Sequence, residues 1–404
     1  MKEAYIVDGI RTPIGRFRGT LSTMRADDLA AYPLKGLMDR HPDMDWAAID
    51  DVIMGCANQA GEDNRNIARM ALLLAGLPFI VPGETVNRLC ASGMSAIVHA
   101  YRAIKANEGD VFISAGMEHM TRGPWVMSKA STPFGQDSKL YDSSFGWRFI
   151  NPKMEEIYGT DAMGQTAENL VDIHKISRED QDRFAAWSHE KAARAQENGR
   201  LDKEILPVFI PQRKKDPIRF AHDEFVRKGT TAEVLAGLRP AFRKEGGTVT
   251  AGNASGLNDG ACATLIASEQ GLKTHNLKPL ARIVCSGVAG VEPRIMGIGP
   301  VDATRKALKR AGLSLDDMDV IEINEAFSAQ SLAVTRSLGL EDNDPRINPN
   351  GGAIALGHPL GMSGNRITYS AALELNLQNK RYALCTMCIG VGQGYAVILE
   401  NPNV

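Results

Sequence analysis

The chain has 404 residues, 44% of them hydrophobic, and a formal net charge of −2 at pH 7. A chain of this length and composition can bury more than one core, so we expect a globular protein of two or three domains. Because the charges nearly balance, no global field attracts nucleic acid or an anionic membrane surface. These features favour an enzyme that acts on a small molecule.

Three further patterns concern the compartment. No run of eighteen apolar residues occurs, so we expect no membrane span. Residues 1–8 lack the pattern of a signal or transit peptide. The six cysteines are scattered and lie mostly in apolar runs, which is unlike a disulfide framework. We therefore expect a protein of the reducing cytoplasm.

The first third of the chain alternates short apolar runs with helical patterns. The helix predicted for 92–106 has apolar residues at helical spacing, from Met94 to Ile104. The other elements, in chain order, are a strand at 4–7, a helix around 29–38, a strand at 52–54 and a strand at 111–115. This alternation predicts an α/β fold with mixed or parallel sheets.

Residues 122–250 differ in character, because they are more charged and richer in helical pattern. Ser177 to Asp180 has the form of a capping box that opens a helix, and Gly199 closes that helix. We expect this segment to be an inserted domain.

The last third repeats features of the first. Asp51-Val52-Ile53 is matched by Asp319-Val320-Ile321, and Cys90 and His358 each follow 39 residues after the aspartate of their copy. Three residues further on, both copies read Gly-Met-Ser. We infer an internal duplication with Cys90 and His358 at equivalent elbows. The first half would comprise residues 1–121 and 251–272, and the second half residues 273–404.

Cys90 and His358 are the candidate reactive residues of the two elbows. Cys90 lies between a predicted strand and the first turn of a helix, where N–H groups and the helix dipole lower a thiol pKa. The alternative is a buried structural thiol. His358 follows a stretch whose glycines and prolines fix an irregular backbone, as is typical where a side chain must be aimed. Its alternative is a solvent-exposed turn histidine.

Cys388 lies at the end of a predicted strand that begins at Tyr382, and a glycine-rich connection leads into a second strand at 395–399. Because the glycines precede a strand and not a helix, they are not a dinucleotide fingerprint. Cys385 and Cys388 point to opposite faces of a strand, and no second pair completes a zinc site. We expect no metal.

Asn324 ends the predicted strand 320–323, at the carboxyl edge where α/β sites gather. The alternative, which is compatible with the first, is that Asn324 caps a helix.

The segments around Cys90, Asn324, His358 and Cys388, in this order, resemble the thiolase family over essentially the whole chain. The resemblance implies a duplicated αβαβα layered fold with an inserted loop domain. It also implies that Cys90 accepts the acyl group, that His358 activates its thiol, and that Cys388 moves the proton at the α-carbon of acetyl-CoA. Asn324 would hold a water that stabilises the enolate together with His358, and the N–H groups of Cys90 and Gly390 would form a second oxyanion site.

For the substrate, the resemblance implies coenzyme A as co-substrate with no permanently bound cofactor. The residues it points to for this role are Ser255 near the pantetheine, Arg227 near the nucleotide, and Met163, Phe242, Met296 and Phe327 along the tunnel. It further implies a homodimer or homotetramer, without nucleic acid or membrane partners.

Two segments, 61–66 and 146–152, resemble thiolases that cleave 3-oxoadipyl-CoA to succinyl-CoA and acetyl-CoA. Ala162 stands where acetoacetyl-specific relatives usually have histidine. The hypothesis for the free carboxylate of such a substrate is Arg148, because an arginine fork binds carboxylates well. The alternative for Arg148 is a surface or interface arginine. The alternative for the substrate is that of a general 3-ketoacyl-CoA or acetoacetyl-CoA thiolase.

Three other classes remain to be weighed. A ketosynthase-type enzyme would lack the second catalytic cysteine, which Cys388 supplies here. A non-catalytic CoA-binding or lipid-carrier protein would have lost part of the reactive set, which is intact. A redox or metal protein built on Cys385 and Cys388 would bind metal on purification.

Overall fold

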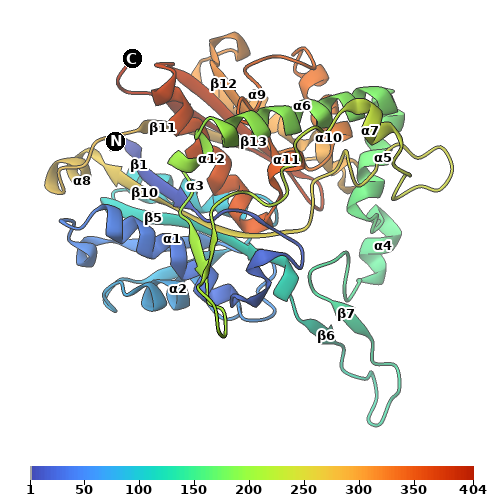
Figure 1. The fold of residues 1–404 in the computed structure, drawn as a ribbon, viewed down its shortest axis with the longest axis horizontal. Helices are drawn as coiled ribbons and strands as arrows, with labels where there is room; N and C mark the ends of the chain where they lie inside the picture. The colour runs from blue at the N-terminus through green and yellow to red at the C-terminus, as the bar shows by residue number, and fades with distance from the viewer. Residues whose placement is uncertain (1) are drawn as a thin grey trace.

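The computed structural model describes residues 2–404. Within this range, ten strands form one mixed sheet in the order β12-β13-β14-β11-β1-β10-β5-β3-β4, with β2 beside β10 (Figure 1). β3 runs parallel to β4 and β5, and β12 runs parallel to β13, whereas the other pairs are antiparallel. The predicted α/β fold with a mixed sheet is confirmed.

The first half supplies one side of this sheet. β1 continues well beyond the predicted 4–7, because after a register shift at Val7 the backbone pairs with β10 as far as Arg11. β5 likewise extends past Ala115 along the same neighbour. The elements are β1 (Ala4–Arg11), β2 (Gly15–Arg16), α1 (Ala26–Arg40), β3 (Asp51–Gly55), α2 (Ile67–Ala75), β4 (Gly83–Val86), α3 (Ser92–Lys105), β5 (Val111–His119), β10 (Asn258–Ser268) and α8 (Glu269–Thr274).

The second half repeats the arrangement of strand, elbow and helix. β12 corresponds to β3, and α12 corresponds to α3, as the duplicated motifs predict. The two halves join directly, since Tyr5 of β1 pairs with Arg282 of β11. The elements are β11 (Ala281–Gly290), α9 (Gly299–Ala311), β12 (Val320–Ile323), α10 (Ser328–Ser337), α11 (Ala353–Leu356), α12 (Leu360–Leu377), β13 (Tyr382–Ile389) and β14 (Gln393–Glu400).

Three large hydrophobic cores fill the spaces between five layers, and the inner core covers both faces of the central helical layer. The inner core holds α3 and α12 between the strands of the two halves, and it includes Met94 and Ile97 of α3 together with Ile367 and Leu375 of α12. One outer core packs α1 and α2 on the first half, and the other packs α9 on the second half. The thiolase-like αβαβα layering expected from the sequence is therefore present.

The two central helices approach each other closely at their first turns. A Cβ on Gly93 of α3 would collide with the carbonyl oxygen of Gly361 of α12, and a Cβ on Gly364 would collide with Met94. Only glycine allows this approach. The packing brings the residues that precede the two helices, including Cys90 and His358, to the same end of the inner layer.

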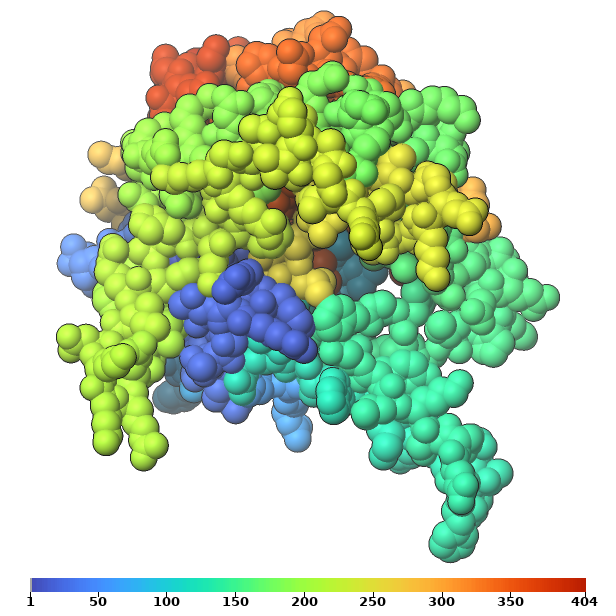
Figure 2. Space-filling view, turned by 45° about the vertical axis from the view of Figure 1, so that its right-hand side comes forward, coloured from blue at the N-terminus to red at the C-terminus, as the bar shows by residue number. Residues whose placement is uncertain are grey.

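Residues 122–250 add no strand to the large sheet, and Figure 2 shows them spread over one face, around a hollow with C-terminal atoms at its base. Ser177 caps α6 by accepting a hydrogen bond from the N–H of Asp180 at 3.0 Å. The elements are β6 (Trp125–Met127), β7 (Leu140–Asp142), α4 (Pro152–Tyr158), α5 (Met163–His174), α6 (Arg178–Glu197), β8 (Val208–Ile210), β9 (Ile218–Phe220) and α7 (Ala232–Ala236).

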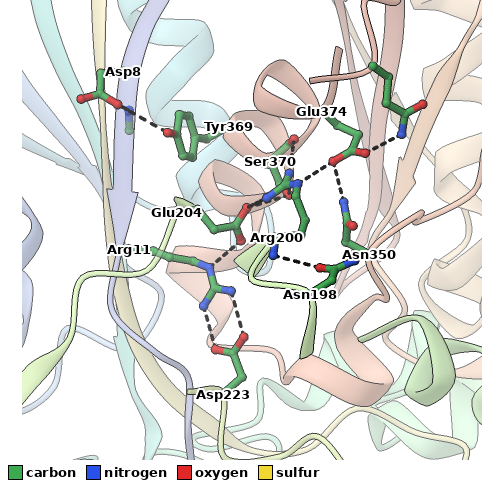
Figure 3. A network of polar contacts seen from close by, with 12 residues as sticks. Asp8, Arg11, Asn198, Arg200, Glu204, Asp223, Asn350, Tyr369, Ser370 and Glu374 are labelled. Carbon is green, nitrogen blue, oxygen red and sulfur yellow. Dashed lines mark hydrogen bonds and ion pairs between the residues drawn. The ribbon is translucent and has the colours of Figure 1, made fainter. Parts of the chain in front are cut away.

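A buried ionic network fastens this segment to both halves (Figure 3). It consists of Arg11, Arg200, Glu204, Asp223 and Glu374. Arg11 comes from β1 and Glu374 from α12, while the other three residues belong to the inserted segment. Among residues 2–404, no helix combines the length and apolar character that crossing a membrane requires.

Candidate active site

Cys90 lies in a tight turn between β4 and α3. Leu89 has a φ of 47°, in the left-handed region that costs a non-glycine residue about 1–3 kcal/mol. Side chains hold this turn, because Asn87 accepts from the N–H of Leu89 at 2.8 Å and Ser92 accepts from the N–H of Arg88 at 2.8 Å. The turn places Cys90 two residues before Ser92, the first residue of α3.

The environment of Cys90 corrects one expectation from the sequence. Burial raises the pKa of the thiol to about 11, although the backbone N–H groups of Gly390 and Cys90 itself act in the lowering direction. The nearby charge of Glu118 raises the pKa further. Desolvation thus outweighs the helix N-terminus. Cys90 is a thiol at neutral pH, and it needs a base to become a nucleophile.

His358 lies at the matching elbow before α12. Gly357 has a φ of 107°, and a Cβ there would collide with the side chain of Asn258, whose Oδ1 accepts from the N–H of His358 at 3.0 Å. His358 is buried, so the alternative of a solvent-exposed turn histidine is wrong. Burial, assisted by the charge of Arg366, lowers its pKa to about 3. The imidazole is therefore neutral and able to accept a proton.

Two side chains contact the imidazole from opposite sides. Asn324 Nδ2 lies 3.4 Å from Nε2, and Ser363 Oγ lies 2.6 Å from Nδ1. Asn324 follows the last residue of β12 but caps no helix, because Phe327 is the N-cap of α10. Among residues 2–404, no hydrogen-bond partner reaches the buried Oδ1 of Asn324. Asn324 therefore keeps one polar atom for a ligand.

Cys388 is buried near the end of β13, in the hairpin with β14 that the sequence predicts. Burial, and then the charge of Cys90, raise its pKa well above the usual range. The second effect requires the two thiols to be close in space. Cys385 packs in the inner core and Cys388 in a separate cluster, so the two face opposite sides of the strand as predicted.

Four of the expected substrate contacts gather around Cys388. Met296 and Phe327 share its apolar cluster, and the ring of Phe242 meets that of Phe327 edge to face at 6.2 Å between centroids. Met163 begins α5, with its sulfur beside Gly390. These side chains form an apolar wall next to the two thiols.

The remaining predicted contacts lie further out. The N–H of Ser255 donates to the carbonyl of Ala326 at 3.0 Å, which keeps Ser255 beside the wall. Arg227 is exposed, with its guanidinium 5.3 Å from the ring of Phe225. Arg148 is half-buried and donates to the carbonyl of Ser143 at 2.8 Å and to Oδ1 of Asn58 at 3.4 Å. Within residues 2–404, no hydrogen bond or ion pair joins Arg227 or Arg148 directly to Cys90, His358 or Cys388.

Cys56, Asp63 and Glu118 form a buried cluster with metal-ligating atoms. The carboxylate oxygens already accept hydrogen bonds. Glu118 accepts from the backbone N–H groups of Ala57, Asn58 and Gly361. Asp63 accepts from the backbone N–H groups of Gln59 and Gly61. A carboxylate that accepts three backbone N–H groups has few lone pairs left for a cation. The cluster instead ties the loop after β3 to the His358 elbow.

Sequence reasoning missed Glu118, Asn258 and Ser363. Glu118 and Asn258 reach the elbows from distant strands, and no local pattern marks them. Ser363 did carry a signal, because it ends one of the two Gly-Met-Ser matches. The repeated motif indicates the duplication, but the sequence does not show that the Ser363 side chain contacts His358.

The comparisons with known proteins agree with this geometry. Two family descriptions match consecutive parts of the chain, "Thiolase, N-terminal domain" over residues 4–270 and "Thiolase, C-terminal domain" over residues 277–401. The chain is 60% identical over 401 residues to the 3-oxoadipyl-CoA/3-oxo-5,6-dehydrosuberyl-CoA thiolase of Escherichia coli K12, covering 99% of this chain and 100% of that protein. It is 57% identical, with the same coverage, to a beta-ketoadipyl-CoA thiolase of Acinetobacter baylyi.

Among solved structures, human mitochondrial 3-ketoacyl-CoA thiolase superposes with a TM-score of 0.91 at 42% identity, and 99% of each chain is covered. Both the sequence matches and this superposition extend over nearly the full length, so they include both elbows and the β13–β14 hairpin. This chain belongs to the thiolase family of acyltransferase enzymes.

Proposed function

We propose that this thiolase cleaves 3-oxoadipyl-CoA with coenzyme A, giving succinyl-CoA and acetyl-CoA through an acyl group on Cys90. The observation that carries the proposal is the 60% identity, over the whole length, to a relative named for that substrate. The human relative named for 3-ketoacyl-CoA in general is only 42% identical. A general 3-ketoacyl-CoA or acetoacetyl-CoA thiolase is the alternative.

Cys90 and His358 act as a neutral pair in the first step. With a pKa of about 11, converting the Cys90 thiol to thiolate at pH 7 costs about 5–6 kcal/mol, at about 1.4 kcal/mol per pH unit. His358, whose pKa is about 3, does not hold that proton stably before reaction. Proton transfer to His358 Nε2 therefore accompanies the attack of Cys90 sulfur on the 3-keto carbonyl.

The following steps divide between two oxyanion sites. The N–H groups of Cys90 and Gly390 stabilise the tetrahedral oxyanion on the acyl carbon. When the C2–C3 bond breaks, the enolate of acetyl-CoA is stabilised by His358 and by a water on Asn324, and Cys388 protonates its α-carbon. A second coenzyme A then takes the succinyl group from Cys90.

Coenzyme A lies along the wall formed by Met163, Phe242, Met296 and Phe327, with its pantetheine near Ser255. Arg227 binds the nucleotide from the exposed end, where a cation can meet phosphate without first being buried. Much of this site comes from residues 122–250, which we regard as the substrate-binding unit. Coenzyme A is a co-substrate here, and the reaction needs no permanently bound cofactor.

Arg148 binds the far carboxylate of the substrate. Two hydrogen bonds connect Arg148 to the turn that carries Cys90. Arg148 donates to Asn58, and the carbonyl of Ala57, the residue before Asn58, accepts from Asn87 of that turn at 3.0 Å. Two N–H groups of the guanidinium are used in these contacts, which leaves others for an anion.

The variant Arg148→Lys tests this assignment. It should raise KM for 3-oxoadipyl-CoA by about 10-fold or more, since a bidentate carboxylate contact is lost. KM for an uncharged 3-oxoacyl-CoA should not change. An equal effect on both substrates would place Arg148 outside the carboxylate site.

The function itself is tested by CoA-dependent cleavage of 3-oxoadipyl-CoA, acetoacetyl-CoA and a medium-chain 3-oxoacyl-CoA, with Cys90→Ala as control. A clear preference for the dicarboxylic substrate, lost in the control, is expected. Cleavage of only the uncharged substrates would favour the general thiolase. Failure to cleave any of them would favour a non-catalytic CoA-binding or lipid-carrier protein.

We also propose a cytoplasmic homodimer or homotetramer that binds neither nucleic acid nor membrane. The β6–β7 arm supports self-association, because it projects from the body and exposes large apolar side chains, among them Trp125 and Phe134 (Figure 1). Light scattering after size-exclusion chromatography gives the mass, and a monomer would contradict the proposal.

A further inference from the structure

The hydroxyl of Ser363 makes two hydrogen bonds inside the protein. It lies 2.6 Å from Nδ1 of His358, and it donates to the carbonyl oxygen of Pro359 at 2.9 Å. Ser363 is fully buried one turn into α12, so no bulk water competes for either contact. The carbonyl of Pro359 is four residues earlier, which is the usual target of a helical serine.

The number of protons in this arrangement is limited. A serine hydroxyl has one proton, and when that proton is donated to Pro359 the oxygen can only accept from the imidazole. Nδ1 must then be protonated. We propose that Ser363 is a positioning residue that holds His358 in the tautomer with its proton on Nδ1 and a bare Nε2.

The tautomer matters because the imidazole is neutral. Burial and the charge of Arg366 disfavour the doubly protonated ring, so His358 has a single N–H proton that can sit on either nitrogen. With the proton on Nε2, the nitrogen that faces Asn324 could not accept a proton from Cys90. With it on Nδ1, Nε2 has a lone pair that Asn324 Nδ2 contacts only at a long 3.4 Å, and this lone pair can take the thiol proton when that weak contact gives way.

The equivalent serine of the first half supports a positioning role. Ser95 occupies the same place in Gly93-Met94-Ser95 that Ser363 occupies in the second copy. Its hydroxyl lies 3.0 Å from Nε of Arg88, two residues before Cys90. In both halves, therefore, the serine in the first turns of the helix reaches back to a side chain of the elbow.

This inference rests on the proposed role of His358 as base, and its test must be independent of the acyl substrate. Nitrogen-15 NMR of histidine-labelled protein reports the protonation of each ring nitrogen directly. The exchange of labelled coenzyme A with acetyl-CoA reports Cys90 acylation without requiring 3-oxoadipyl-CoA. Both measurements are made on wild type, Ser363→Ala and Ser363→Thr.

Thr368→Ala is the matched control. Thr368 is buried on the same helix and donates to the carbonyl of Gly364 at 2.7 Å, but it does not touch His358. Its variant removes the same kind of bond to the residue four positions earlier. A loss of activity common to both alanine variants would come from the helix and not from the tautomer.

We expect wild type to show a protonated Nδ1 and a bare Nε2. Ser363→Ala should place part of the population on Nε2–H and slow the exchange about 10- to 100-fold, the range for losing a buried hydrogen-bond partner. Ser363→Thr and Thr368→Ala should resemble wild type in both measurements. A wild-type His358 with its proton on Nε2 would overturn the inference without any variant. So would a Ser363→Ala protein whose tautomer and exchange rate are unchanged. Neither result depends on which 3-oxoacyl-CoA is cleaved.

Discussion

Glu204 is the centre of the buried ionic network, and replacing it by glutamine tests how the inserted segment is held. Its Oε1 accepts from Nε of Arg11 at 2.7 Å, and its Oε2 accepts from Arg200 and from the hydroxyl of Ser370, both at 3.0 Å (Figure 3). The side chain is 1% exposed. Glu204→Gln keeps the shape but removes the charge that two buried guanidinium groups share.

The expected magnitude follows from the pKa of Glu204. Burial by itself would raise that pKa, but Arg11 and Arg200 lower it from its usual 4.5 to about 2. A fall of about 2.5 pH units, at about 1.4 kcal/mol per unit, corresponds to about 3–4 kcal/mol. Breaking one member of a buried pair costs about 3–5 kcal/mol in other proteins. We expect Glu204→Gln to lower the free energy of unfolding by about 3–5 kcal/mol at pH 7.

The effect should depend on pH in a definite direction. Because the pKa of Glu204 is lower in the folded state than in the unfolded chain, its contribution is fully present above about pH 4.5. The contribution is lost as the pH falls from 4.5 towards 2. The difference between wild type and variant should therefore be constant from pH 6 to 8 and shrink below 4.5.

Urea unfolding followed by circular dichroism measures the free energy, and hydrogen exchange over residues 200–224 shows whether the inserted segment loosens first. Glu197→Gln is the control, since Glu197 pairs with Lys228 at the exposed surface, where such a pair contributes about 0–1 kcal/mol. A Glu204→Gln protein as stable as this control would refute the reasoning.

Three other predictions concern the site. Alkylation of Cys90 by iodoacetamide should accelerate about tenfold per pH unit from 7 to 10, because only the thiolate reacts and the pKa of about 11 keeps the thiol mostly protonated. A rate that reaches a plateau below pH 9 would contradict this. Cys388→Ala should slow thiolysis by about 10²- to 10⁴-fold, the usual contribution of a general acid, while coenzyme A exchange with acetyl-CoA through Cys90 continues. Loss of both activities would show that Cys388 has another role. Gly93→Ala should lower the free energy of unfolding by about 1–3 kcal/mol, because the added Cβ meets the carbonyl of Gly361. Gly237→Ala, where a Cβ has room, should change that free energy little, and denaturant unfolding measures both.

The sequence alone predicted the thiolase family and its reaction, because the motifs that identify the family are short and can be recognised locally. Cys90, His358 and Cys388 each follow or end an element whose period and glycines are visible in the chain, and the duplicated Gly-Met-Ser placed the first two at equivalent elbows. The helix at 92–106 was correct to within a residue at its C-terminal end. The strands at 4–7 and 111–115 were too short, since their ends depend on pairing with β10 and not on their own apolar residues.

Only the tertiary structure decided the protonation and the hydrogen-bond partners of these residues. The helix N-terminus predicted a lowered pKa for Cys90, but burial contributed by both halves raises it, and no local pattern contains that desolvation. His358 takes its neutral charge from burial and Arg366, and one of its hydrogen bonds comes from Asn258, 100 residues earlier in the chain. The network around Glu204 joins β1, α12 and the inserted segment, and its contact between Arg11 and Asp223 spans 212 positions of the chain. Periodicity and motifs predict local structure, because they depend on residues that are near one another in the sequence. The pKa values and buried ion pairs depend on which distant segments pack together and exclude water.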